Sequence, residues 1–334
     1  MTMTAPIPDN RLAELLACPP EQWNLAWLQK SLQLAVELEL ATLPPYLCGY
    51  WSCKNSGDPV PKLINGVVLQ EMFHMGLAAN MLVAIGGPPT INTRVPTYPG
   101  PLPGGVQPEL TVSLSGLTKS YVGDVYMAIE FPEAGPITPP APQLTIGKLY
   151  GAISDALARV NPPFSATNQL NASIGEDSLT IITSVAEAQA AINVIKEQGE
   201  GTATSPDDSD GAELAHYYRF GEIFNGAQLI QTNGAWTYSG AAVPFPETYP
   251  MSVIPAGGWG SGVPANVAAL LSTFDKAFTS VLDNLQAAWT TGSQDSLTSA
   301  VNSMFALSGP GISLMQIPVD SGAGTYGPDF LYTP

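Results

Sequence analysis

The sequence predicts a mainly helical protein built on a four-helix bundle, with a long decorated crossover after the second bundle helix and a helical and loop-rich C-terminal extension. Two observations carry this prediction. Apolar residues recur at spacings of three and four along several segments, as in helices that bury one face. Both histidines of the chain, His74 and His216, follow a glutamate by three positions within such segments. Two helices would therefore turn the same polar pair inward.

The first two bundle helices are expected at about 22–45 and 61–86. In the first, Glu39 lies in the middle of the apolar stripe, so its carboxylate is predicted to face the core. The second ends at Gly86-Gly87, and glycine commonly terminates a helix. A Pro44-Pro45 pair shortly after Glu39 removes backbone donors, so it either ends or kinks the first helix.

The remaining elements follow from changes in composition. Residues 87–183 are rich in proline and glycine with little helical period apart from a helix at 145–160, and form the crossover. The third and fourth bundle helices are expected at about 184–198 and 211–226. The extension, 227–334, holds an Asn-Gly hairpin signal, a strongly amphipathic helix and a shorter one.

Length and charge restrict the class of protein. The 334 residues, 45% of them hydrophobic, are assigned to one domain, 1–334. The 28 acidic residues against 11 basic ones give a net charge of −17, which opposes binding to nucleic acid and to anionic membranes. Three cysteines without C-x-x-C spacing argue against a disulfide framework and a cysteine zinc site. We expect a cytoplasmic protein, monomeric or dimeric, that binds neither nucleic acid nor membrane.

The repeated Glu-x-x-His pattern predicts a metal site. Residues three apart on a helix share a face, so the carboxylate and the imidazole aim at one point. With 15 glutamates in 334 residues, chance would place this spacing before both histidines only about once in 500. Two such helices, with one inward glutamate from each of two others, form the dinuclear carboxylate site of ferritin-like bundles. The predicted ligands are Glu39, Glu71, His74, Glu197, Glu213 and His216.

Alternatives remain open at this site. Glu200 competes with Glu197 for the place on the third helix, because both lie where that helix ends. A single inward Glu39 or His216 would by itself be read as a locally satisfied core residue. Four or more inward polar residues are costly to bury unless something pairs them, which favours a metal. Carboxylate-rich ligation suits hard cations, so two iron ions are predicted, with manganese as the alternative.

A second group of side chains near these motifs is a candidate substrate pocket. Aromatic residues at helical spacing also occur in ordinary cores, and the arginine of the group could simply pair with Glu222 or bind a substrate carboxylate. The candidates are Tyr46, Phe73, Tyr217, Phe220 and Arg219.

Four motifs, VELELATLPPYL at 36–47, LQEMFHM at 69–75, INVIKEQGEGT at 192–202 and ELAHYYRFGEI at 213–223, are similar to a known family. They resemble the ferritin-like domain of the iminophenyl-pyruvate dimer synthases of violacein-type and rebeccamycin-type bisindole pathways. The resemblance implies an oxidative role in secondary metabolism, in which two metal ions activate dioxygen or peroxide to oxidise or couple amino-acid-derived imines. Lys148 stands where the family favours an acid and is kept, with Glu200, as a secondary candidate near the metals.

The leading hypothesis is thus a non-haem dinuclear-metal oxidoreductase, an oxidase or oxygenase, that acts on a small aromatic or amino-acid-derived metabolite. One alternative is a metal-binding or ferroxidase-type protein without an organic substrate. Another is a metal-free scaffold that binds a partner through its acidic surface.

Overall fold

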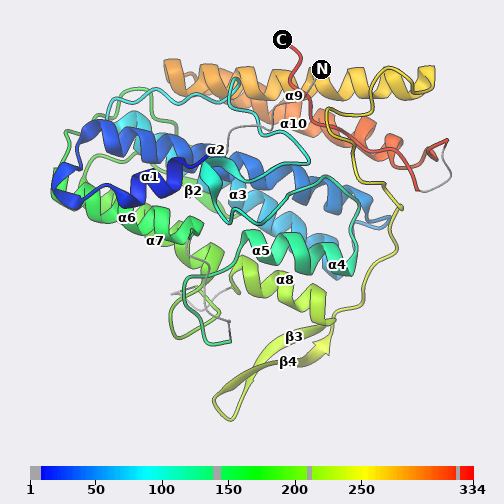
Figure 1. Ribbon diagram of the computed structural model, residues 1–334, viewed down its shortest axis with the longest axis horizontal. Helices are drawn as coiled ribbons and strands as arrows, with labels where there is room; N and C mark the ends of the chain where they lie inside the picture. The colour runs from blue at the N-terminus through cyan, green and yellow to red at the C-terminus, as the bar shows by residue number, and fades with distance from the viewer. Residues whose placement is uncertain (1–8, 138–143, 209–212, 321–323) are drawn as a thin grey trace.

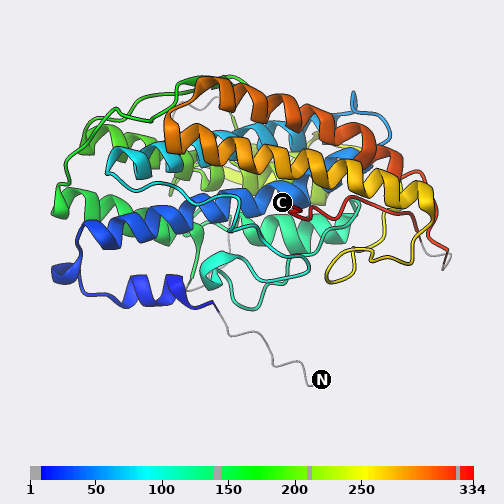
Figure 2. The same cartoon turned by 90° about the horizontal axis from the view of Figure 1, so that it is seen from above.

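The computed structural model describes residues 9–137, 144–208, 213–320 and 324–334, and helices stacked in three layers dominate it (Figures 1 and 2). This confirms the predicted mainly helical fold. The middle layer is the pair α2 (Leu25–Ser52) and α3 (Pro59–Ala84), whose residues are largely buried. The outer layer on one face is the hairpin of α9 (Ala265–Thr291) and α10 (Gln294–Leu314). The layer on the other face comprises α6 (Ile146–Val160), α7 (Val185–Glu200), α8 (His216–Asn225) and the short helical segment described next.

The crossover supplies part of the third layer. Short helical stretches follow one another directly from Lys119 to Ile129 and pack against α8 (Figure 1). In the same layer, α6 and α7 pack on each other and cover the other end of the α2–α3 pair. The elements of the segment are α4 (Lys119–Tyr121), the π-helical turn η3 (Val122–Tyr126) and α5 (Met127–Ile129).

The third layer is therefore broken in the middle. The end of α7, the start of α8, the end of α5 and the start of α6 all lie over the centre of α2 and α3 (Figure 1). Helix ends carry the chain's changes of direction, so side chains from several distant segments meet at this junction. The remaining elements are α1 (Arg11–Ala17), η1 (Pro20–Gln22), η2 (Pro103–Gly105), the hairpin β1 (Ala172–Ile174) with β2 (Asp177–Leu179), and the hairpin β3 (Ala227–Thr232) with β4 (Ala235–Ala242).

The first bundle helix is longer than predicted. The sequence predicted either an end or a kink at Pro44-Pro45, and the end is wrong, because α2 continues to Ser52. Pro45 cannot donate to the carbonyl of Ala41, which is four residues earlier. The hydroxyl of Tyr98 donates to that carbonyl instead, at 2.7 Å. A side chain from the crossover thus satisfies the group that the proline leaves unpaired, and the helix can continue.

One helix among the described residues, α3, is long and apolar enough by composition to cross a bilayer. Its most apolar window is 89% buried inside the protein. Its hydrophobicity is therefore explained by its place in the core between the two outer layers.

Candidate metal centre

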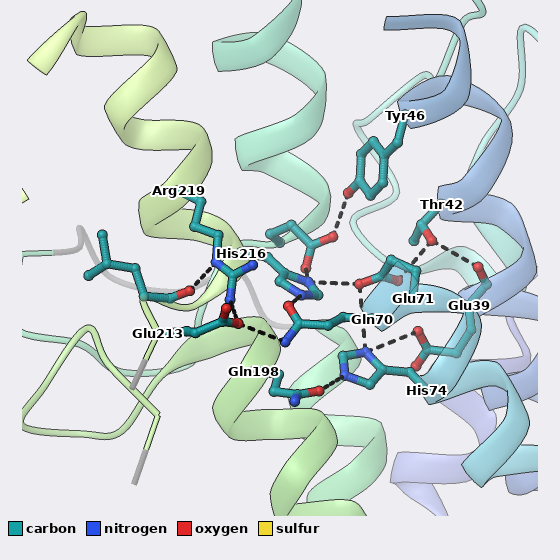
Figure 3. Close-up of polar contacts among 12 residues, drawn as sticks. Glu39, Thr42, Tyr46, Gln70, Glu71, His74, Gln198, Glu213, His216 and Arg219 are labelled. Atoms are coloured by element: carbon teal, nitrogen blue, oxygen red, sulfur yellow. Dashed lines mark hydrogen bonds and ion pairs between the residues drawn. The ribbon is translucent and has the colours of Figure 1, made fainter. Parts of the chain in front are cut away.

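Three donors meet at the centre of the junction. Glu71 and His74 lie on α3, one turn apart, and His216 is the first residue of α8; all three are buried. Oε1 of Glu71 lies 2.7 Å from Nδ1 of His216 and 3.6 Å from Nδ1 of His74. One ligand atom from each residue falls within 4.8 Å of the others. Figure 3 shows both rings directed at the same carboxylate.

Two further carboxylates flank this group. Oε2 of Glu39, from α2, lies 3.9 Å from Nδ1 of His74. Oε2 of Glu130, which follows the last residue of α5, lies 3.5 Å from Nδ1 of His216. The two imidazole rings stack with their centroids 5.4 Å apart. The centre therefore has two halves that share Glu71: half-site A, made of Glu39 and His74, and half-site B, made of Glu130 and His216.

Hydroxyl groups hold the carboxylates in both halves. Tyr150 donates to Oε1 of Glu39 at 2.5 Å, and Tyr46 donates to Oε1 of Glu130 at 2.5 Å. Thr42 donates to Oε2 of the shared Glu71 at 2.8 Å (Figure 3). In each case one carboxylate oxygen is fixed by a hydroxyl while the other is directed at a histidine.

The electrostatics of the cluster favour a cation. Burial and the neighbouring Glu71 raise the pKa of Glu39 well above its ordinary value, and burial with the same neighbour raises the pKa of Glu130. Burial alone would raise the pKa of Glu71, but contacts with His216 and His74 outweigh it and hold that pKa well below its ordinary value. Burial alone would lower the pKa of His216, but Glu130 and Glu71 raise it to about 9. A bound cation would favour the ionised form of these carboxylates, because metal ligands bind in their deprotonated state.

The donor set fits hard divalent metals. Nδ1 of His216 is buried and lies 2.7 Å from Oε1 of Glu71 as an ion pair, but it makes no hydrogen bond within the described part of the chain. A buried polar atom of this kind is costly unless something binds it. Three carboxylates and two imidazoles are the donors of dinuclear iron and manganese sites. The residues present therefore fit a metal centre, which Glu39, Glu71, His74, Glu130 and His216 would hold.

A small cavity adjoins the centre. Its volume is about 30 Å³, which is room for one or two water-sized species and not for an aromatic metabolite. Glu200, the last residue of α7, contributes a further carboxylate to its wall, and burial raises the pKa of Glu200 to about 7. The other lining residues are Glu39, Glu71, His74, Ile129, Glu130, Phe131, Ile146, Gly147, Tyr150, Ile195, Lys196 and Gly199.

Comparison with known proteins identifies the family to which this fold belongs. A family model described as Ferritin-like matches residues 32–225, from α2 to the end of α8. The chain belongs to the ferritin-like family. It is also similar in structure to a ferritin-like protein from Caulobacter vibrioides, with a TM-score of 0.63 and 23% sequence identity over 93% of this chain and 99% of that one. No curated protein matches. The ferritin-like superfamily includes di-iron proteins and di-iron oxidoreductases.

The fourth-helix glutamate of this ferritin-like chain is not at the centre. Glu213 pairs with Nη2 of Arg219 at 2.5 Å, and its side chain is about half exposed. The helix was predicted over 211–226, but α8 begins only at His216. Glu213 therefore precedes the helix, and the shared face that the Glu-x-x-His spacing implies does not exist there. Residues 211 and 212, at the start of that predicted helix, lie outside the described residues.

The third-helix position is also filled differently. Glu197 is half-buried on α7 and is not among the residues that line the cavity, whereas Glu200 lines it and accepts a hydrogen bond from the backbone of Glu133 at 3.0 Å. The carboxylate nearest His216, apart from Glu71, comes from Glu130 instead. Sequence reasoning missed Glu130 because it caps a three-residue helix in the crossover, which is too short to show a period.

The predicted pocket residues surround the centre without lining the cavity. Tyr46 contacts the centre through its hydrogen bond to Glu130. The ring of Phe220 packs on that of Tyr46, with centroids 5.1 Å apart. Phe73 lies beside His74, with ring centroids 6.1 Å apart. The other two have partners outside the metal cluster: Tyr217 packs on Phe131, and Arg219 pairs with Glu213 rather than with Glu222.

Lys148 is not part of the cavity wall either. It lies on α6 between Gly147 and Tyr150, which do line the cavity. Successive residues of a helix point about 100° apart, so the neighbours of a lining residue need not face the same way. The residue of α6 that contacts the centre is Tyr150, through its hydrogen bond to Glu39, and not the predicted Lys148.

Proposed function

We propose that this chain is a dinuclear-metal oxidoreductase whose metal ions, iron or else manganese, are held by Glu39, Glu71, His74, Glu130 and His216. The observation that carries the proposal is the position of Glu71, which lies between two histidines that each have a carboxylate of their own. A carboxylate shared by two such halves would suit two cations held close together. When bound, the metals would supply the redox chemistry toward dioxygen or peroxide.

The protein's own groups would orient the ligands and control protons. Tyr150 and Tyr46 fix one oxygen of each outer carboxylate, so the second oxygen is held toward the metals. Glu200 lies on the cavity wall with its pKa raised to about 7 by burial. Its Oε2 accepts the backbone N–H of Glu133, which leaves Oε1 to hold or release a proton near neutral pH.

The cavity wall also favours an amino-acid-derived organic substrate. Ile129, Phe131 and Ile195 offer apolar contacts, and Lys196 is the one lysine or arginine of the described lining. Nζ of Lys196 now pairs with Glu133 at 3.1 Å, partly exposed to solvent. A substrate carboxylate could replace Glu133 as the partner of Lys196 and bring an aromatic group toward Phe131. In line with the resemblance to iminophenyl-pyruvate dimer synthases, we propose oxidation or coupling of aromatic imino acids.

One observation favours a second candidate function. The cavity of about 30 Å³ admits ions, water or dioxygen without any movement, whereas an aromatic imino acid requires the wall to open. A ferroxidase-type protein without an organic substrate would need no such opening.

The test has two stages. Protein made in iron-supplemented or manganese-supplemented medium should carry about two ions per chain, and His74→Ala and His216→Ala should each bind less. Less than about one ion per chain, unchanged in His216→Ala, would count against any metal centre. The Fe(II) protein is then mixed with dioxygen or hydrogen peroxide and an aromatic imino acid. New organic products absent without metal support the oxidoreductase, while Fe(II) oxidation alone supports the ferroxidase.

A further inference from the structure

The outer nitrogens of both histidines meet glutamine side chains. Nε2 of His216 lies 3.1 Å from Oε1 of Gln70, and Nε2 of His74 lies 2.8 Å from Oε1 of Gln198 (Figure 3). An amide oxygen can only accept a hydrogen bond. If the amides are oriented in this way, each Nε2 carries a proton and each Nδ1 is left to face Glu71.

Two acidic residues fix the orientation of these amides. Nε2 of Gln70 donates to Oε2 of Glu213 at 3.1 Å, and Nε2 of Gln198 donates to Oδ1 of Asp177 at 3.1 Å. An ionised carboxylate only accepts, so the NH₂ end of each amide must face the acid and the oxygen must face the histidine. The chemistry of the partners thus determines the amide orientation.

We infer that Gln70 and Gln198 are positioning residues, which set the ring orientation and tautomer of His216 and His74, and that Glu213 and Asp177 act through them. The two chains of contacts, Glu213–Gln70–His216 and Asp177–Gln198–His74, are called the relays below. The inference rests on the proposed function because it assigns Nδ1 of each ring to a metal. It also gives Glu213 a role at the centre without making it a ligand.

The use of an amide rather than a carboxylate next to the ring has a physical reason. Glu39, Glu71 and Glu130 already bring three buried carboxyl groups to the centre, and another charge in contact with each ring would add to their repulsion. A neutral glutamine accepts the Nε2 proton without adding charge. The acid is then placed one residue further out, where Glu213 is half exposed and paired with Arg219.

The two relays are built from different parts of the chain. Gln70 precedes Glu71 on α3 and reaches forward to α8, whereas Gln198 comes from α7 and reaches back to α3. Asp177 is the first residue of β2, in the small crossover hairpin. The acid, the amide and the imidazole of one relay thus each come from a different element than their counterparts in the other relay. The repeated acid–amide–imidazole order therefore does not result from one pair of helices packing on each other.

The test uses the two histidines as separate reporters, since they are the only ones in the chain. Protein labelled with ¹⁵N-histidine is studied by long-range ¹H–¹⁵N correlation, both metal-free and loaded with diamagnetic Zn(II). Gln70→Leu should move or broaden the Nε2 signal of His216 and leave that of His74 in place. Gln198→Leu should do the reverse. Each variant should weaken Zn(II) binding by about 10- to 100-fold.

Matched variants separate positioning from folding. Gln189→Leu is the control on α7, because Gln189 bonds the backbone and hydroxyl of Ser154 on α6 and touches neither ring; it should leave both rings unchanged. Gln70→Glu keeps an acceptor beside His216 and should retain the hydrogen bond from Nε2 that Gln70→Leu loses.

The outcomes are distinguishable. Unchanged His216 signals and Zn(II) affinity in a Gln70→Leu protein that melts like the wild type would overturn the inference. Wild-type protein that binds neither Zn(II), Fe(II) nor Mn(II) would overturn the proposed function instead, and the metal-free spectra would still decide whether each glutamine holds its ring.

Discussion

Oε1 of Glu71 lies 2.7 Å from Nδ1 of His216, and this contact joins the middle of α3 to the first residue of α8. The same oxygen lies 3.6 Å from Nδ1 of His74. A single carboxylate thus belongs to both halves of the centre, which makes it the residue whose removal should affect both.

Replacing Glu71 by glutamine keeps its volume and removes the shared charge. We expect Glu71→Gln to reduce tightly bound Mn(II) from about two ions per chain to less than one, because each metal loses a bridging ligand. Calorimetric titration with Mn(II) and elemental analysis measure this directly. Retention of both ions would contradict a bridge at Glu71.

The contributions of Glu130, from the crossover, and Glu197, from the third predicted bundle helix, to metal binding can be compared. Glu130→Gln should weaken metal binding at half-site B, leaving about one tight ion per chain, because a charged oxygen beside His216 is lost. Glu197→Gln is the matched control and should bind metal as the wild type does. The opposite ranking would restore Glu197 as the ligand.

The tyrosine hydroxyls should stabilise the metal-free protein. Tyr150→Phe removes the donor to buried Glu39 and should lower the free energy of unfolding by about 1–3 kcal/mol, because a buried acceptor loses its partner. Urea unfolding of the metal-free variant gives the value. Tyr332→Phe removes a similar bond to Asp283 at the surface, and its effect should be under about 0.5 kcal/mol.

Two glycines of α6 provide a test of the cavity wall. A Cβ at Gly147 would come within 2.0 Å of Oε1 of Glu200, whereas one at Gly151 would approach only Nζ of Lys196, at 3.8 Å. Gly151→Ala should therefore stabilise the helix by about 0.5–1 kcal/mol. Gly147→Ala should instead destabilise the protein by about 1 kcal/mol, because Glu200 must move and lose its bond from Glu133. An equal increase in the free energy of unfolding for Gly147→Ala and Gly151→Ala would show that the Glu200 carboxylate does not lie against Gly147.

The extension carries a pH-dependent pair far from the metal centre. Burial, together with the neighbouring Asp329, raises the pKa of Asp275 from 3.8 to about 7. Because the folded-state pKa lies above the unfolded one, the contribution of this carboxyl to stability is fully present below pH 3.8 and is lost as the pH rises to about 7.

Asp275→Asn should accordingly raise the free energy of unfolding at pH 8 by about 1–2 kcal/mol. This value is smaller than the pKa shift of Asp275 alone would give, because Asp275 and Asp329 are partly screened by solvent. The substitution should make little difference near pH 4. Its side-chain oxygen can still accept from the backbone of Leu331, as Asp275 does at 3.2 Å. Urea unfolding across this range is the measurement, and Asp283→Asn, at an exposed site on the same helix, should show no such gain at high pH.

Local patterns in the sequence were sufficient for several features. Helical periodicity placed α2, α3, α7 and α9, and the Asn-Gly pair placed the turn between β3 and β4, where Asn233 and Gly234 have positive φ. The inward orientation of Glu39, Glu71 and His74 followed from the same periodicity, because these residues lie well inside long helices. The fold class and most of the cluster could therefore be predicted.

Contacts between distant segments decided the rest. The hydrogen bond from Tyr98 to Ala41 allows α2 to continue beyond Pro45. Because α8 begins at His216, Glu213 lies outside the helix. Glu130 comes to the centre from the crossover. The sequence by itself determined which residue types must share a buried centre, since periodicity is a property of neighbouring positions. Only the tertiary structure decided which carboxylates reach it, because helix ends and short crossover turns are fixed by packing against other segments and not by a local pattern.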